Sequence, residues 1–548
     1  MMLELESYLK IQIEKALQTL NFPEINYQFD RPKQEAYGNI SANLAMLLAK
    51  PLKQNPRQIA AQIVETLSLD SEKIAKVDIA GPGFINFFIA PAAFRKGVEN
   101  ILNTNEDYGK FNVGKSKRVL VEFVSANPTG PLSVGHGRQA VLGDTIARLL
   151  EWLGYDVTRE YYFNNAGRQM RVLGDSVRLR YLELLGEKIK FPDDYYRGEY
   201  IVDIAKKLLE KHGKSLKNLP PDDLEIFKNA AESEIFADIK KTLARLGIVF
   251  DSFFNESELY DRGDIDAVLN FFKERGLAYE KDGAVWFKAT EFGLDQDRVI
   301  VKSSGEPTYR LPDIAYHRDK FKRGFDLMID IFGSDHIATY PDVLAGIKAL
   351  GYDPSKIKVL INQFVTLFEG KEKVKMSTRR ANFITIDELV DEVGEDVTRW
   401  FYLMRSMQSH LNFDLKLAKT HSDENPVFYN QYAHARICSL LRKAAAKGFA
   451  PGNAETLHRL SEKSEFNLIA KLMEFPKVVF RCANGHEPHN LIQFLSEIST
   501  AFHKFYTECR IISDDTELTR TRLALCVATR TVLANGFRIL GVSSPESM

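Results

Sequence analysis

A histidine flanked by glycines stands where an apolar strand turns into a helix, in the segment VEFVSANPTGPLSVGHGRQ at residues 121–139. Two prolines and three glycines in this segment indicate a sharp turn. The first turn of a helix leaves N–H groups free for phosphate, and ligands of parallel sheets bind at such junctions. We therefore expect Gly135, His136 and Gly137 to bind a nucleotide. A histidine in an ordinary tight turn is the alternative.

A second candidate for phosphate chemistry is the segment VTLFEGKEKVKMSTRRANFITIDEL, residues 365–389. Lys375, followed by Met376 and Ser377, lies in a basic loop after a predicted strand. A lysine in such a loop can neutralise the negative charge that grows on a departing pyrophosphate. Because a lysine-rich loop is also a common solvated surface, the segment is informative mainly through its distance along the chain from His136.

Three predicted parts of the chain must position these residues. Residues 1–112 have the pattern of a small α+β unit, with helices at 5–20, 41–48 and 58–67 and a strand at 83–89. Over residues 113–400 apolar strands alternate with helices, which is typical of an α/β fold with a parallel sheet. Residues from about 172 to 290 are rich in charged helical pattern and are expected to be an insertion. Residues 401–548 are expected to form an all-α bundle. The sheet strands are predicted at 118–124, 155–163, 298–303, 325–332 and 358–365.

Composition narrows the class of protein. The chain has 548 residues, of which 45% are hydrophobic and 27% charged, and its net charge is -1. These values are typical of a globular protein and exclude a polycation that binds nucleic acid over its whole surface. The four cysteines form no C-x-x-C pair, which argues against a zinc ribbon or a disulfide scaffold. The chain lacks an apolar run of ~18 residues, and its start is amphipathic, so we expect a cytoplasmic protein with no membrane span.

The two phosphate-binding segments together resemble the class I aminoacyl-tRNA synthetases. His136 matches the last histidine of their H-x-G-H motif, while Ser133 takes the place of the first. Lys375 matches the first lysine of their K-M-S-K-S motif, and the phrase VEFVSANPTGPLSVGHGRQAVLGD is similar to the arginyl branch specifically. The resemblance covers essentially the whole chain and implies a Rossmann-type catalytic domain, with His136, Lys375 and Ser133 as the catalytic candidates.

The resemblance also implies how the substrates bind. A Gly-x-Asp turn faces the ribose of ATP in class I enzymes, so Gly333 and Asp335, with His336 beside them, are candidates for ATP binding; a turn capped by Asp335 is the alternative. ATP would enter with Mg²⁺ as a substrate complex, with no protein metal site and no tightly bound cofactor. The segments that match the arginine-binding phrases of the family contain Glu122, Asn127, Tyr309 and Asp313.

These last four residues suit a guanidinium group. A guanidinium is planar, always charged and has five donors, so carboxylates and a ring face should select it. Glu122 lies in an apolar strand, where a carboxylate needs a cationic partner or water. Tyr309 and Asp313 are four residues apart, so one helical turn places them on the same side. The alternatives are that Asp313 caps a helix or pairs with Arg310 or Arg318, and that Glu122 is an ordinary strand residue facing solvent.

The helical C-terminal part resembles the anticodon-binding domain of the same family. Aromatic and cationic side chains interleave there as Tyr429, Tyr432, His434 and Arg436, a pattern that suits stacking of unpaired RNA bases, although helix-spaced aromatics are more often core. The N-terminal part is similar to the extra domain that these enzymes place against the tRNA, and activation of the amino acid in this family commonly requires bound tRNA. The expected partners are tRNA(Arg), ATP and L-arginine, and we expect a monomer.

Three other functions remain to be weighed. A synthetase for another amino acid would share both motifs. A catalytically silent, synthetase-like RNA-binding protein is favoured by Ser133 and by Thr378, which replaces the second lysine of the K-M-S-K-S motif. A small nucleotidyltransferase with a similar phosphate loop is excluded by the length of the chain and by its helical C-terminal part.

Overall fold

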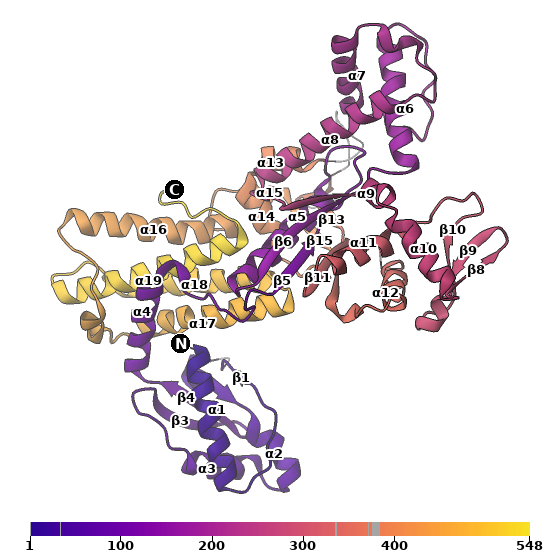
Figure 1. Cartoon of the computed structure of the whole chain (residues 1–548). Coiled ribbons are helices and arrows are strands. Elements are labelled where there is room, and N and C mark those ends of the chain that lie inside the picture. The colour runs from indigo at the N-terminus through magenta and orange to yellow at the C-terminus, as the bar shows by residue number, and fades with distance from the viewer. Residues whose placement is uncertain (1, 33, 335–336, 371, 375–383) are drawn as a thin grey trace.

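A five-stranded parallel sheet lies at the centre of the molecule (Figure 1). The computed structural model describes residues 2–32, 34–334, 337–370, 372–374 and 384–548. The order of strands in the sheet is β12-β11-β5-β6-β7, and every neighbouring pair is parallel. The bounds are β5 Arg118–Glu122, β6 Asp156–Phe163, β7 Ser252–Asn255, β11 Leu327–Gly333 and β12 Ile357–Asn362. The predicted α/β fold with a parallel sheet is confirmed.

Helices cover both faces of this sheet. Helix α5, Val134–Trp152, packs on one face, where a Cβ atom on Gly143 would lie 2.2 Å from the ring of Phe123. A glycine at this position therefore lets the helix approach the end of β5 closely. Gly154 follows α5 with a φ of +81°, the left-handed conformation predicted for the end of this helix. Helices α11, Arg310–Lys322, and α12, Tyr340–Ala349, cover the opposite face.

The region expected to be an insertion contains two units separated by a strand of the main sheet. Helices α6, α7 and α8 project from the sheet at the top of Figure 1, and their bounds are Arg168–Leu184, Glu199–His212 and Glu225–Arg245. Strand β7 then returns to the main sheet beside β6. The prediction of one continuous insertion over residues 172–290 was wrong at this strand. The four residues of β7, which include two phenylalanines, form the edge strand of the parallel sheet.

A second unit follows β7 and forms a separate antiparallel sheet with the order β10-β9-β8. Its elements are α9 Glu256–Asp261, α10 Asp264–Glu274, β8 Ala278–Lys281, β9 Ala284–Phe287 and β10 Arg298–Val301. The strand predicted at 298–303 is therefore present, but it belongs to this sheet rather than to the parallel one. An apolar run of this length fits either partner, and only the pairing with β9 decides.

The N-terminal part folds as the predicted α+β unit, an antiparallel sheet with the order β1-β2-β4-β3 and helices against it. The helix expected from Ser41 begins later, because Ile40–Ala42 extend as β2 and pair with β4. Helix α4 then leads to the catalytic part and packs on α17, Lys463–Gly485, and α19, Thr516–Leu540, of the C-terminal bundle. The bounds are α1 Met2–Thr19, β1 Phe29–Asp30, β2 Ile40–Ala42, α2 Leu44–Leu52, α3 Pro56–Thr66, β3 Ile74–Ala80, β4 Phe84–Ile89 and α4 Pro91–Thr104.

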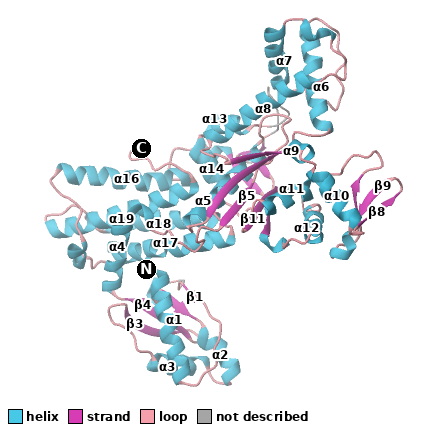
Figure 2. Cartoon of the chain, in the orientation of Figure 1, coloured by secondary structure: helices cyan, strands magenta, loops and turns pink. Residues whose placement is uncertain are grey.

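Four long helices form the predicted C-terminal bundle, in which the structure places almost no strands (Figure 2). They are α16 Pro426–Ala446, α17 Lys463–Gly485, α18 His489–Glu508 and α19 Thr516–Leu540. Among the described residues α19 is the one helix long and apolar enough to cross a membrane, but 78% of its apolar window is buried inside the protein. Helix α19 is therefore the core helix of the bundle.

Small elements join the central sheet to the bundle. Strand β13 pairs with β14 and with β15, so the chain makes one more strand after residue 401, where only helices were expected. Helices α13 and α14 lie between β14 and β15 in the chain and pack against α5. The bounds are β13 Val365–Glu369, β14 Glu372–Lys373, α13 Ile386–Val393, α14 Glu395–Leu403, β15 Leu411–Asp414 and α15 Leu415–Ala418.

Candidate active site

The turn after β5 is held in a strained conformation. Val124 and Ser125 have φ angles of +68° and +39°, a region that a β-branched residue such as valine rarely adopts. Two hydrogen bonds hold Ser125 in place: its Oγ donates to Glu122 Oε1 at 2.9 Å and accepts from the backbone N of Tyr162 at 3.1 Å. The turn therefore fixes the end of β5 against β6 before the chain enters the GHG segment.

Ser133 and His136 form the N-terminal cap of α5. The backbone N of Ser133 donates to His136 Nδ1 at 3.2 Å, and Ser133 Oγ lies 3.2 Å from the same nitrogen. Because Nδ1 accepts a hydrogen bond, a neutral His136 carries its proton on Nε2, where it can be donated to a phosphate. Ser133 thus orients the histidine that follows it.

The two glycines beside His136 have different surroundings. A Cβ atom on Gly135 would meet only Ser133 Oγ, at 3.6 Å, so a ligand can approach the backbone there. On Gly137 it would lie 2.8 Å from the hydroxyl of Tyr402. Gly137 is buried against α14 and serves helix packing, so the structure does not support its predicted contact with a nucleotide.

The candidates Lys375, Met376 and Ser377 of the basic segment lie outside the described residues, as do Asp335 and His336. The residues on either side of the basic segment are described. On one side, Val374 N donates to Leu367 O at 3.0 Å. On the other, Ile384 O accepts from Val134 N at 3.2 Å, and Ile386 N donates to Leu132 O at 2.9 Å. The chain therefore re-enters the described structure directly beside the cap that holds His136.

Gly333 lies at the same edge of the sheet as this cap. It is the last residue of β11, the strand next to β5, and the carboxyl ends of parallel strands meet at one edge. The sheet thus brings the candidate Gly333 and the turn that carries His136 to one side of the molecule.

A row of three acidic side chains crosses the sheet at this edge. Asp330, Glu122 and Glu160 are direct neighbours on β11, β5 and β6, and each is at most 3% exposed. Like charges on neighbouring strands repel each other, so the row needs cations. The C-terminal end of helix α11, with its cap residue Arg323, supplies them: Arg323 donates to both oxygens of Glu160, at 2.6 and 2.8 Å.

Lys320 is the second cation of α11 and is fully buried. Its Nζ donates to Glu122 Oε2 at 2.6 Å and to Asp330 Oδ1 at 2.7 Å. Burial alone would lower the pKa of Lys320, but Asp330 and Glu122 raise it above its ordinary value. Glu122 is therefore buried rather than solvent-facing, and the cationic partner that the sequence required is Lys320.

Asp313 lies on the same helix and, with Glu122 and Glu256, forms an acidic cluster beside this row. No described residue hydrogen-bonds its carboxylate. Burial raises the pKa of Asp313 to about 7, with Glu256 and Glu122 adding to the rise and His317 and Lys320 opposing it. Arg310, one alternative partner, donates instead to Asp342 Oδ2 at 2.6 Å. Asp313 and Glu122, which were predicted to act together, are thus close enough for their charges to interact.

Glu256 is a member of this acidic cluster that the sequence did not predict. It is 7% exposed, its Oε2 accepts from the hydroxyl of Tyr162 at 2.8 Å, and burial raises its pKa. Glu256 follows directly after the short apolar strand β7, as Glu122 ends β5. The signal for Glu256 in the sequence is an acid directly after a short aromatic-rich strand. The prediction of one insertion over residues 172–290 did not include that strand.

Tyr309 and Asn127 have exposed side chains at this edge. Tyr309 is 79% exposed, and its backbone carbonyl oxygen accepts a hydrogen bond from Asp313 N at 3.2 Å, so the two residues share one helical turn as predicted. Asn127 lies in the turn after β5 and is exposed as well. Both side chains are therefore accessible to a ligand that binds at the acidic cluster.

Three of the four RNA-binding candidates on α16 share one face. The guanidinium of Arg436 lies 4.5 Å from the ring centre of Tyr432 and 5.1 Å from that of Tyr506 on α18. The ring of Tyr429 lies 5.1 Å from that of His503. Tyr429, Tyr432, Arg436, His503 and Tyr506 are called the aromatic patch below.

His434 lies on the other side of α16. It is 4% exposed, its ring faces Phe537, and its Nδ1 lies 2.9 Å from the carbonyl oxygen of Pro545. A ring enclosed in this way cannot stack on a base, so the structure contradicts the prediction that His434 contacts RNA. Helical spacing alone did not show which face of α16 is buried.

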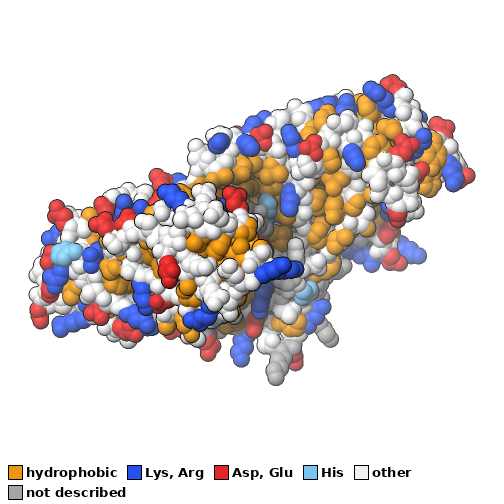
Figure 3. Space-filling model, turned by 90° about the horizontal axis from the view of Figure 1, so that it is seen from below, with side chains coloured by type: hydrophobic (Ala, Val, Ile, Leu, Met, Phe, Trp, Pro, Cys, Tyr) orange, Lys and Arg blue, Asp and Glu red, His pale blue; other side chains and the backbone are white. Residues whose placement is uncertain are grey.

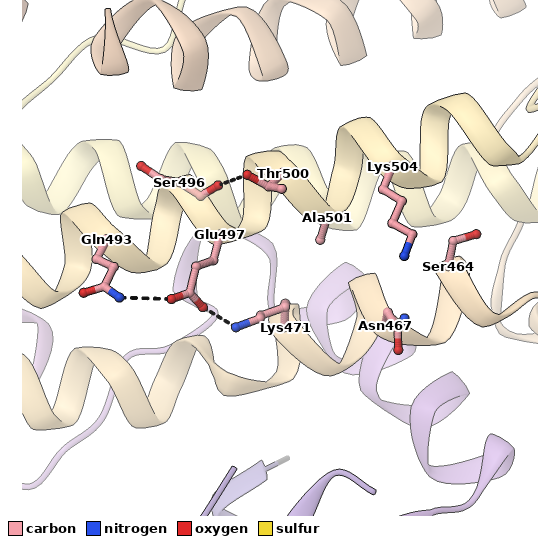
Figure 4. A pocket seen from close by; sticks show the side chains of 9 residues that line it. All are labelled: Ser464, Asn467, Lys471, Gln493, Ser496, Glu497, Thr500, Ala501 and Lys504. Carbon is pink, nitrogen blue, oxygen red and sulfur yellow. Dashed lines mark hydrogen bonds and ion pairs between the residues drawn. The ribbon is translucent and has the colours of Figure 1, made fainter. Parts of the chain in front are cut away.

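A polar groove adjoins the aromatic patch. It lies between α17 and α18, has a volume of about 460 Å³ and contains the ion pair between Lys471 and Glu497 (Figure 4). Thr500 lines the groove and its Oγ1 lies 3.1 Å from the hydroxyl of Tyr429. On the face of the molecule seen in Figure 3, acidic and basic side chains are interspersed rather than separated by sign. The aromatic patch and the groove thus place aromatic and polar side chains beside one another.

The comparisons with known proteins agree with this geometry. Three family models match: the N-terminal domain of arginyl-tRNA synthetase at residues 7–89, the catalytic domain of class I tRNA synthetases (R) at 97–410, and the DALR anticodon-binding domain at 430–548. The arginine–tRNA ligase of Desulfotalea psychrophila is 53% identical over 524 residues, which cover 95% of each chain. That of Salinibacter ruber is 49% identical and covers 99% of this chain and all of its own.

A solved structure supports the fold. The arginyl-tRNA synthetase of Thermus thermophilus superposes with a TM-score of 0.76 at 22% identity and covers 99% of this chain and 100% of its own. From the family models and the sequence identities, the chain belongs to the arginyl-tRNA synthetases, the class I enzymes that join arginine to its tRNA with ATP.

Proposed function

We propose that this member of the family carries out both steps of the ligation at the edge of the central sheet where β5 and β11 end. Arginine and ATP first give arginyl-adenylate and pyrophosphate. The terminal adenosine of the tRNA then takes the arginyl group, and AMP leaves. The adenosine hydroxyl attacks the mixed anhydride directly and forms no covalent link to the protein, so positioning and electrostatics supply most of the rate.

The environment of the Asp313 carboxylate is the observation that carries the proposed specificity for arginine. Its carboxylate accepts no hydrogen bond from a described residue, and the charges of Glu256 and Glu122 act on it, so this acidic cluster can take up a further cation. We assign Asp313 and Glu256 to the guanidinium, Tyr309 to its planar face, and Glu122 and Asn127 to the remaining polar groups of arginine. Charge-assisted hydrogen bonds are worth about 1.5–3 kcal/mol each, and a lysine side chain lacks the fork geometry needed for two-point binding.

The cap of α5 is assigned to the phosphates of ATP. His136 donates from Nε2, the open backbone at Gly135 approaches the nucleotide, and Ser133 acts by orienting His136. Mg²⁺ enters with ATP as part of the substrate. Lys375 neutralises the departing pyrophosphate. The other proposed ATP contacts are Gly333, Asp335, His336, Met376 and Ser377.

The C-terminal bundle is assigned to the anticodon loop of tRNA(Arg). In the aromatic patch, Tyr429, Tyr432 and Arg436 offer rings and a guanidinium plane for stacking of unpaired bases. We further propose three functional domains, 1–112 against the tRNA, 113–400 for catalysis and 401–548 for the anticodon, in a cytoplasmic monomer.

The decisive experiment is pyrophosphate exchange with ATP, tRNA(Arg) and each amino acid in turn. Arginine alone should support exchange, and omission of the tRNA should abolish it. Exchange driven by lysine or methionine but not by arginine would contradict the specificity. Absence of any exchange or charging would support the catalytically silent RNA-binding protein instead.

A further inference from the structure

Arg399 connects three parts of the chain from a fully enclosed position. It lies on α14, is 1% exposed, and its guanidinium donates to Asp144 Oδ2 of α5 at 2.6 Å. It also donates to Leu246 O after α8 at 2.7 Å and to Leu540 O at the end of α19 at 2.8 Å. Both carbonyls lie at helix C-termini, where they lack partners within the helix and where a cation is favoured.

Arg148 repeats this connection from α5 itself. Its Nε donates to the same Asp144 Oδ2 at 2.8 Å, and its other nitrogens donate to Gly247 O at 3.1 Å and Arg538 O at 3.3 Å. Two arginines thus join one aspartate of α5 to the ends of the same two helices, α8 and α19. Asp144, Arg148 and Arg399 are called the arginine clasp below.

The three parts share one hydrophobic core and also border a common cavity. A cavity of about 450 Å³ opens beside the clasp, and its lining includes Arg148, Arg399 and residues of α8, α14 and the chain after α19. Directly beside it, Gly541 has a φ of +68° and leaves no room for a side chain, since a Cβ atom would lie 2.4 Å from the Arg399 guanidinium. The hydrogen bonds of the clasp therefore add directional contacts to the packing and help to fix the relative positions of α5, α8 and α19.

The clasp acts on the helix that carries His136. Asp144 follows His136 by two turns of α5, about 12 Å at 1.5 Å per residue, and a packed helix transmits displacement along its axis. Helix α19 belongs to the bundle assigned to the tRNA, and α8 belongs to the projecting helices. We propose that Arg399 and Arg148 are positioning residues, which hold the phosphate-binding end of α5 in register with the tRNA-binding bundle during tRNA-dependent arginine activation. This inference rests on the proposed function.

Arg399→Lys is the main test. A lysine still reaches Asp144 but cannot also donate to two separate carbonyls. We expect the rate of tRNA-dependent exchange per active site to fall about 10- to 100-fold, because a misplacement of about 1 Å can cost that much rate. The active sites are counted from the burst of adenylate formation. The KM values of arginine and ATP should stay nearly unchanged. Gly541→Ala, which displaces the guanidinium and keeps its charge, should act in the same direction.

Arg522→Lys is the matched control. Arg522 is 8% exposed, and it donates to Glu465 Oε1 at 2.7 Å and to Arg510 O at 3.0 Å, but these contacts stay within the bundle. It should lower the melting temperature about as much as Arg399→Lys while the rate per active site stays within about twofold. An equal loss of rate in both variants, or an unchanged rate in Arg399→Lys, would overturn the inference.

Arg148→Lys keeps the test decisive if Arg399→Lys does not fold, because the side chain of Arg148 is 28% exposed and a folded variant is expected. A rate per active site lower by at least about threefold would support the clasp, and an unchanged rate would overturn it. Failure of the wild-type chain to activate arginine would instead reject the proposed function.

Discussion

The Nζ of Lys320 lies 2.6 Å from Glu122 Oε2 at the buried end of β5, and both side chains are almost fully enclosed. The same Nζ holds Asp330 on the neighbouring strand at 2.7 Å. Lys320 thus neutralises two of the acids beside the proposed arginine site. Asp313 and Glu256 remain as the acids that an incoming cation can neutralise.

Replacing Lys320 with methionine should destabilise the protein strongly. Glu122 and Asp330 would stay buried without a cation, and loss of one partner from a buried ion pair costs about 3–5 kcal/mol. We expect a clear fall in the midpoint of thermal unfolding, followed by circular dichroism.

Lys322→Met is the control for this change. Lys322 is on the same helix, but its side chain is 45% exposed and pairs with Asp264 at 3.0 Å on the surface. An exposed pair is worth less than about 1 kcal/mol, so the midpoint should hardly move. Equal effects of the two substitutions would show that the buried acids need no resident cation.

Arginine affinity should depend on pH through Asp313. In the unliganded protein burial raises the pKa of Asp313 to about 7, so below this pH the carboxyl is mostly protonated. A guanidinium binds the carboxylate, and binding must therefore expel a proton below pH 7. The dissociation constant of arginine should rise about tenfold for each pH unit below 7 and level off above it.

Calorimetry in two buffers of different ionisation enthalpy can test this proton release. Asp313→Asn has no proton to release, so its weaker binding should be independent of pH over the same range. A wild-type dissociation constant that stays flat from about pH 5.5 to about pH 8 would contradict the coupling.

Glu256→Gln should impair the use of arginine without affecting ATP. Removing one charge-assisted hydrogen bond of about 1.5–3 kcal/mol corresponds to a loss of about 10- to 150-fold in kcat/KM for arginine. The KM of ATP should stay nearly constant. Glu258→Gln on the same helix, whose carboxylate accepts from Asn255 at 3.0 Å, is the control and should retain full activity. A similar loss in both variants would show that Glu256 has no specific role in binding arginine.

The sequence was sufficient for the parts of this site that depend on local pattern. The turn before His136 follows from its glycines and prolines, and the end of α5 follows from Gly154. Lys320 could not be foreseen, because a lysine in DIAYHRDKF has the pattern of a solvated side chain. Only the packing of α11 over the acids of three strands buries it. Glu256 was missed for a related reason, since a four-residue strand has too little periodicity to stand out between charged helices.

The two faces of α16 should respond differently to substitution. Tyr432→Ala removes a ring of the aromatic patch, and because stacking of a base on a ring is worth about 1–3 kcal/mol, the KM of tRNA should rise about 5- to 150-fold with little change in melting temperature. His434→Ala removes a buried ring that contacts Phe537 and Pro545, so the melting temperature should fall while the KM of tRNA stays the same. Steady-state aminoacylation with thermal melts of both variants separates the two effects. If His434→Ala raised the KM of tRNA and Tyr432→Ala did not, the RNA-binding face of α16 would be the opposite one.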